Sequence, residues 1–223
     1  MALWKQFPRQ VSEAVGCPAL VYSRHGYGKS DKLERARAAD YMHREALEVL
    51  PEILDQLDIG APVLIGHSDG ASIALIHAGR AGRPVQGVVA MAPHVFVENM
   101  TVRSIAEARA TFESSDLADR LARYHDDVVS VFRGWNDIWL HPDFLRWNIE
   151  DCLDGIHCPV LLIQGEDDPY GTVAQLEAIA RQVSGPVKTV MLPDCGHSPH
   201  QSLQKDATIA AIVRFVADLR EAR

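Results

Sequence analysis

The sequence is short of basic residues and has no long apolar run. Its 22 lysine and arginine residues stand against 30 aspartate and glutamate residues, for a formal net charge of -8. Nucleic-acid phosphates and anionic membrane surfaces are bound by basic faces, so we expect neither partner. No apolar run approaches the roughly 20 residues of a membrane-spanning helix. The start "MALWKQFPRQ" also lacks the charged head and apolar body of a signal peptide.

Cysteine is scarce as well, and no metal-binding pattern is evident. The four cysteines are Cys17, Cys152, Cys158 and Cys195. They are too scattered for a disulfide scaffold, which favours reduced thiols and a cytoplasmic location. His197 and His200 have no third ligand at metal-binding spacing. We therefore expect neither a metal nor another cofactor.

The hydrophobic pattern predicts an α/β fold. With 223 residues the chain is long enough for one domain with a substantial core. Short apolar runs rich in β-branched residues predict buried strands at 19–24, 62–68, 85–93, 159–167 and 187–194. Helical patterns are predicted at about 37–57, after Gly70, at about 173–183 and at about 207–219. This alternation is typical of a mostly parallel sheet with helices on both faces.

The segment at about 94–156 breaks the alternation. It is polar, has a helical pattern, and carries four large aromatic residues close together: Trp135, Trp139, Phe144 and Trp147. An insertion between parallel strands emerges at the edge of the sheet where ligands bind. Two interpretations are compatible: a helical lid over a pocket, or aromatics that attach the insertion to the body. We accordingly divide the chain into a first core part (1–93), a lid (94–156) and a second core part (157–223).

A serine stands between a predicted strand and a predicted helix in "PVLIGHSDGASIALIHA", residues 62–78. The pentapeptide "GHSDG" at 66–70 matches G-x-S-x-G, which occurs often by chance. The strand-then-helix setting makes the match informative. Glycines at both ends permit a tight turn, because side chains there would collide with neighbouring elements. The turn would hold the Ser68 hydroxyl at a helix N-terminus, where free N–H groups favour a developing negative charge.

A base and an acid follow later predicted strands. A serine hydroxyl needs an adjacent base that is itself oriented by a third group. Asp167 and Asp168 follow the strand predicted at 159–167, and His197 follows the last predicted strand. Parallel strands end at one edge of a sheet, so Ser68, one of the two acids and His197 can converge there. The order Ser, Asp, His is the one expected for such a fold.

Four motifs in this order resemble the α/β-hydrolase family: "YSRHGYGKSD" at 22–31, "GHSDG", "GEDDPYG" at 165–171 and "GHSPH" at 196–200. The resemblance implies a triad of Ser68, Asp168 and His197, because the family's acid usually stands three residues after the loop glycine. It also implies that the backbone N–H of Asp69 helps to bind an oxyanion. It covers nearly the whole chain and says little about the substrate.

Several residues are candidates to line the pocket: His67, Asp69, Trp135, Trp139 and His200. His67 is expected to pack in the turn and not to act as the base. Two interpretations of the Asp69 carboxylate stay open. It caps the start of the helix, or it faces the pocket mouth and selects substrates with a cationic group.

The resemblance is incomplete at the front of the chain. The start "MALWKQFPRQVSEAVG" resembles the helix that follows the family's third strand. We therefore expect the first three strands to be absent, along with the loop that supplies a second oxyanion N–H group. The runs at 19–24 and 62–68 would then flank an empty slot with unpaired backbone groups, each costing about 1–3 kcal/mol if buried. We expect a truncated or misassigned start, and an unfilled slot would encourage homo-oligomers.

These observations predict a serine hydrolase that cleaves a small ester, thioester or related acyl substrate, including carbon–carbon-linked ketones. Ser68 would attack, His197 would shuttle the proton, Asp168 would orient His197, and water would release an acyl-enzyme. The alternative is a non-catalytic member of the same fold that binds a ligand or a partner.

The missing loop leads to a first prediction. Removing one oxyanion donor costs roughly 10²–10³ in rate. The 223-residue form should therefore hydrolyse p-nitrophenyl esters about a hundredfold more slowly than a form with upstream residues that carry the loop. Equal kcat/KM for the two forms would contradict it.

Overall fold

The computed structural model describes residues 4–221. Its centre is one sheet of four parallel strands that lie side by side in chain order. The strands are β1 (Val63–His67), β2 (Gly87–Met91), β3 (Val160–Gly165) and β4 (Val187–Leu192). Their residues are the apolar, β-branched type that suits a sheet covered on both faces. Four of the five predicted strands are thus confirmed, as is the α/β fold.

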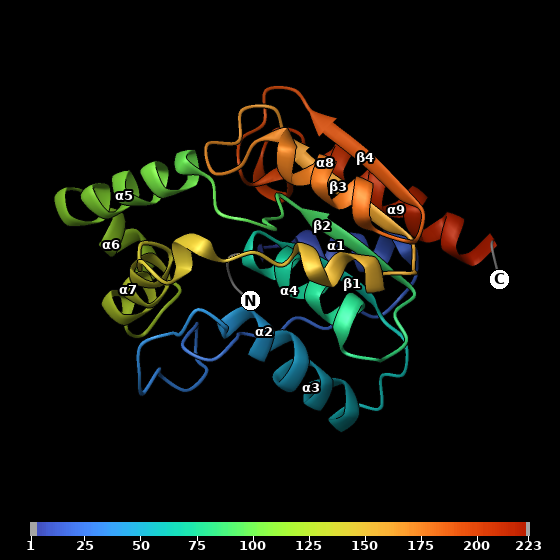
Figure 1. Cartoon of the computed structure of the whole chain (residues 1–223), viewed down its shortest axis with the longest axis horizontal. Coiled ribbons are helices and arrows are strands. Elements are labelled where there is room, and N and C mark those ends of the chain that lie inside the picture. Colours follow the sequence, from blue (N-terminus) through green and yellow to red (C-terminus); the bar gives the residue numbers. More distant parts are fainter. Residues whose placement is uncertain (1–3, 222–223) are drawn as a thin grey trace.

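Helices cover both faces of the sheet (Figure 1). Right-handed connections between neighbouring parallel strands put their helices on the same face. Helices α4 (Asp69–Arg80) and α8 (Val173–Gln182) accordingly pack on one side. The opposite face would be bare without α1 (Phe7–Val15) and α9 (Lys205–Glu221), which pack against each other and against the sheet.

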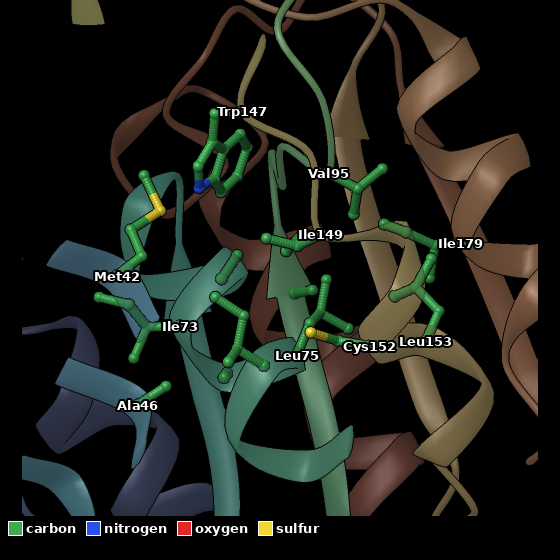
Figure 2. Packing of buried hydrophobic residues seen from close by; sticks show 14 of the residues in the cluster. Met42, Ala46, Ile73, Leu75, Val95, Trp147, Ile149, Cys152, Leu153 and Ile179 are labelled. Carbon is green, nitrogen blue, oxygen red and sulfur yellow. The ribbon is translucent and has the colours of Figure 1, made fainter. Parts of the chain in front are cut away.

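Alternate residues of the central strands feed two separate cores. Val88 and Ala90 of β2 point into the core that contains α4 and α8, whereas Val89 and Met91 point into the core that contains α1 and α9. This is the two-residue period of a strand with both faces buried. Figure 2 shows the first core, in which segments far apart in the sequence meet at Met42, Leu75, Leu153 and Ile179.

The helix predicted at about 37–57 is observed as three joined pieces. They are α2 (Tyr41–Arg44), a π-helical turn η2 (Glu45–Val49) and α3 (Leu50–Gln56). Pro51 follows the wide turn and has no N–H to donate to the preceding turn, so the hydrogen-bond pattern changes there. His77 of α4 is fully buried beneath this helix, with Nδ1 2.7 Å from the carbonyl oxygen of Ala46.

The strand predicted at 19–24 is wrong. The segment is irregular, and Leu20 is 48% exposed. No strand of the described residues lies beside it to complete a ladder, and a β-branched run without a partner does not form a sheet. Local bonds hold the following turn instead, from Gly26 N–H to the Asp31 carbonyl and from Ser30 Oγ to the Ser23 carbonyl. The run therefore does not flank a slot in the sheet, but the other half of that expectation is met, because β1 is the edge of the described sheet and has no strand on its outer side.

The insertion is helical, as predicted. It contains α5 (Asn99–Ser114), α6 (Leu117–Leu121), α7 (Val128–Trp139) and two 3-10 turns, η3 (Phe144–Arg146) and η4 (Glu150–Gly155). Figure 1 shows α5, α6 and α7 grouped beside the layered body. Trp139, Phe144 and Trp147 are buried in the first core, so these aromatics do attach the insertion to the body. The boundaries at 93/94 and 156/157 stay predictions.

All four cysteines are free thiols. Within the described part of the chain, no helix has the length and apolar character needed to cross a bilayer. The cellular compartment stays a prediction from the cysteine pattern.

The contact between α4 and η4 gives a prediction about stability. A Cβ on Gly79 would overlap the carbonyl oxygen of Cys152, whereas a Cβ on Gly60 would meet open space. Gly79→Ala should lower the free energy of unfolding by about 2–3 kcal/mol through overpacking. Gly60→Ala should leave it nearly unchanged in the same urea titration. Equal stability of the two variants would show that α4 and η4 can move apart freely.

Candidate active site

Ser68 lies on a sharp turn between β1 and α4. Its backbone has φ 54° and ψ -124°, a conformation that non-glycine residues adopt only when their surroundings enforce it. The Ser68 N–H donates to the Met91 carbonyl oxygen of β2 at 2.9 Å. A Cβ on Gly66 would overlap the backbone of Gly70, so glycine is required there. The same requirement expected at Gly70 is wrong, because a Cβ there would meet nothing within 4 Å.

The structure brings Ser68, His197 and Asp168 together at the ends of β1, β4 and β3. Ser68 Oγ lies 3.0 Å from His197 Nε2. His197 Nδ1 lies 2.9 Å and 3.0 Å from the two carboxylate oxygens of Asp168. This geometry suits a neutral imidazole that donates Nδ1–H to Asp168 and accepts the serine proton at Nε2. Asp167 is exposed, so Asp168 is the acid that faces the histidine.

The loop that carries Asp168 is held by the insertion. Asp168 Oδ1 accepts from the N–H of Tyr170 at 2.9 Å. From α5, the Ser104 hydroxyl donates to the Pro169 carbonyl at 2.6 Å, and the Thr101 hydroxyl donates to the Tyr170 carbonyl. The first turns of α5 therefore fix the backbone on which the acid stands.

The Asp69 carboxylate is buried and accepts three hydrogen bonds. Tyr41 Oη donates to Oδ2 at 2.8 Å, Arg24 Nη2 lies 3.5 Å from the same oxygen, and Trp139 Nε1 donates to Oδ1 at 3.3 Å. The carboxylate does not cap α4, whose N-cap residue is Ser68. The backbone N–H of Asp69 is the first N–H of α4, and it has no hydrogen-bond acceptor among residues 4–221.

Three further histidines surround His197. The ring centroid of His67 lies 4.9 Å from that of His197 and 4.6 Å from that of His200, and the His94 ring lies 5.9 Å from His197. Burial, with the charge of His197 next, lowers the pKa of His67 well below its usual value and those of His94 and His200 to about 4. All three rings are therefore neutral at pH 7. His94 is not among the residues predicted from the sequence, although it follows β2 as the other site residues follow their strands.

The remaining pocket candidates lie in different surroundings. His67 Nε2 is 2.6 Å from the carbonyl oxygen of His197. His200 packs against the rings of Trp4 and Phe7 at 4.6 Å and 5.7 Å, toward α1. Trp135 is partly buried beside Phe132 at 5.7 Å. Whether these side chains line a substrate pocket stays a prediction. Among the described residues, no group of three metal-ligating side chains converges.

The fold and this constellation can be compared with known proteins. The profile described as "Alpha/beta hydrolase family" matches residues 2–211. The chain belongs to the α/β-hydrolase family. Among curated relatives, the human protein named "Serine hydrolase BPHL" is 25% identical over 192 residues, or 81% of this chain. The mouse protein of the same name is 24% identical. The chain spans 63% of the length of these relatives.

Solved structures share this fold over almost the whole chain. An α/β hydrolase from a Medee basin deep-sea metagenome library matches with a TM-score of 0.73 at 19% identity, covering 97% of this chain and 85% of that one. A thermophilic esterase from Thermogutta terrifontis, with malate bound, matches with a TM-score of 0.70 at 18% identity. That match covers 96% of this chain and 86% of the esterase. At these identities the likeness concerns the fold alone.

The buried histidines predict how stability depends on pH. With pKa values of about 4 in the folded chain, His94 and His200 bind protons in the unfolded state first as the pH falls. Their contribution to the free energy of unfolding is complete above pH 6.5. It is lost as the pH falls toward 4, by up to about 3 kcal/mol for each histidine. Urea unfolding between pH 7 and 4.5 should show this loss. The change of unfolding free energy with pH should be smaller in His200→Phe than in the wild type.

The exposed His157 supplies the control for this measurement. His157→Gln should keep the wild-type dependence of unfolding free energy on pH. An unchanged slope in His200→Phe would show that His200 takes up its proton equally in both states.

Proposed function

We propose that the protein is a serine hydrolase that cleaves a small ester, thioester or related acyl compound through a covalent acyl-enzyme. The observation that carries this proposal is the continuous hydrogen-bonded line from Ser68 through His197 to Asp168. The names of relatives agree with it, since one is called a serine hydrolase and another an esterase.

Ser68 Oγ attacks the substrate carbonyl carbon while His197 Nε2 takes the hydroxyl proton. Asp168 stabilises the imidazolium that forms and holds the ring with Nδ1–H toward itself. The negative charge on the tetrahedral oxygen is stabilised by the Asp69 N–H and the N-terminal dipole of α4. His197 then gives its proton to the leaving alcohol or thiol, and the C–O or C–S bond breaks. Water attacks the acyl-enzyme by the same route, which frees the acid and restores Ser68.

The neutral histidines support a base of this kind. A cationic ring at His67 or His94 would repel the imidazolium that His197 becomes during attack. Their lowered pKa values keep these rings uncharged where the enzyme would work. The groups that stabilise charge during the proposed reaction are then the Asp168 carboxylate and the backbone dipoles, with no opposing charge from these rings.

We also assign the helical insertion at 94–156 the role of a lid. It leaves the carboxyl end of β2, at the edge of the sheet where Ser68 and Asp168 stand, and α5 contacts the Asp168 loop there before the chain returns to the amino end of β3. Ligands of open α/β sheets bind outside the carboxyl ends of the strands. In this proposal the partly buried Trp135 belongs to the wall between lid and substrate, whereas Trp139, 1% exposed, contacts the Asp69 carboxylate instead.

A fluorophosphonate probe tests the proposal directly. It should form an adduct on Ser68, found by peptide mass spectrometry, and Ser68→Ala should abolish it. Asp168→Asn should lower kcat for p-nitrophenyl butyrate by about 10⁴-fold, since the histidine loses its orienting charge. Asp167→Asn, at the exposed neighbour, should leave kcat unchanged.

The absence of labelling would favour the alternative, a non-catalytic protein of the same fold. No adduct on a folded wild-type chain would contradict a serine hydrolase and favour a protein that only binds a ligand or partner. Equal loss in the Asp167 and Asp168 variants would contradict the assignment of the acid.

A further inference from the structure

The carboxylate next to the proposed nucleophile joins three parts of the chain that are distant in sequence. Tyr41 comes from α2, Arg24 from the irregular segment before it, and Trp139 from the last turn of α7 in the insertion. Tyr41 is 6% exposed, Trp139 1% and Asp69 6%. Three donors from separate elements thus hold one buried carboxylate beside the reacting serine.

This arrangement leaves the Asp69 side chain little freedom. A buried carboxylate is tolerated when hydrogen bonds and an opposite charge compensate the lost hydration, and here Tyr41, Trp139 and Arg24 supply both. Burial and the neighbouring carboxylate raise the pKa of Tyr41 well above its usual value, so the hydroxyl keeps the proton it donates. Arg24 is itself placed over the ring of Tyr27, at 5.0 Å.

The backbone at this point needs such support. Ser68 is held at φ 54°, which its own side chain disfavours, and the peptide that follows carries the Asp69 N–H. That N–H must point at the position of the oxyanion, and a displacement of about 1 Å in a catalytic group can cost a hundredfold in rate. The amide nitrogen and the anchored side chain of Asp69 are both bonded to the same Cα, so holding the carboxylate restricts the position of the amide.

We propose that the Asp69 carboxylate is a strut that aims its own backbone N–H at the oxyanion, and that Tyr41 and Trp139 are positioning residues for it. The inference rests on the proposed hydrolase function and adds how the oxyanion donor is held. Because Trp139 belongs to the insertion, the direction of the amide depends on how α7 is docked.

The same geometry disfavours the interpretation that Asp69 binds a cationic group of the substrate. All three donors already occupy the carboxylate, and the positive charge of Arg24 lies 3.5 Å from Oδ2. An ammonium group would have to displace one of these donors and lie beside a guanidinium.

Two tryptophans of the same aromatic cluster make a matched pair of variants. Trp139→Phe removes the N–H that binds Asp69. Trp147→Phe removes a buried N–H that has no partner among the described residues, while its ring stacks on Phe144 at 5.2 Å. We expect Trp139→Phe and Tyr41→Phe each to lower kcat for p-nitrophenyl propionate about tenfold with KM unchanged, since less than a whole oxyanion donor is lost. Trp147→Phe should stay within about twofold of wild type.

An arylboronic acid supplies a readout that packing defects do not move, because its adduct with serine is tetrahedral. Its inhibition constant should rise in Trp139→Phe by the same factor by which kcat/KM falls. Asp69→Ala should slow p-nitrophenyl propionate and the alanine p-nitrophenyl ester equally, by about a hundredfold. Thermal unfolding midpoints are measured for every variant, so that rates are compared between folded chains.

The outcomes separate the strut from the function on which it rests. A wild-type chain without fluorophosphonate labelling overturns the hydrolase, and the strut with it. An active wild type in which Trp139→Phe and Trp147→Phe behave alike overturns the strut alone. A rise in KM confined to the alanine ester in Asp69→Ala overturns it in favour of a cation subsite.

Discussion

The close approach of Gly66 to the backbone of Gly70 is the constraint on which the arrangement depends. It lets β1 turn into α4 within a few residues, and it places Ser68 at the end of the strand in a conformation that only its surroundings maintain. Those surroundings are the Met91 carbonyl of β2 and the anchored carboxylate of Asp69. The Ser68 hydroxyl is therefore positioned by backbone geometry first and by side-chain contacts second.

The insertion holds two parts of the candidate site in place. Hydroxyls of α5 hold the loop of Asp168, and the indole of Trp139 in α7 holds the residue after Ser68. Two sides of the candidate site are thus fixed by a segment that lies outside the alternating strands and helices. Its burial of Trp139 and Phe144 in the first core gives these contacts a rigid base. Trp139 thus both packs in the core and contacts the residue that follows Ser68.

Much of the fold and the centre of the site could be predicted from the sequence, for local reasons. The four strands are short, mostly apolar runs that contain β-branched residues, and Ser68, Asp168 and His197 each follow one, so the rule that parallel strands end together was enough to join them. The run at 19–24 is also apolar at its start, but it has no neighbouring strand, and a strand forms only by pairing with another. The three donors on Asp69 come from positions 28, 45 and 70 residues away, which no local pattern reveals.

The strand order also bears on how the molecule is assembled. Each strand pairs with the one made just before it, so the sheet and the core around α4 and α8 can form as the chain is synthesised. The other core must wait, because α1 precedes all four strands and α9 follows them. Until α9 is made, the apolar face formed by Val89, Met91, Leu161 and Ile163 lacks the side chains of Ile212, Phe215 and Val216 and can be covered by α1 alone. The nascent chain is therefore most exposed to aggregation after β4 is made and before α9 has docked on this face.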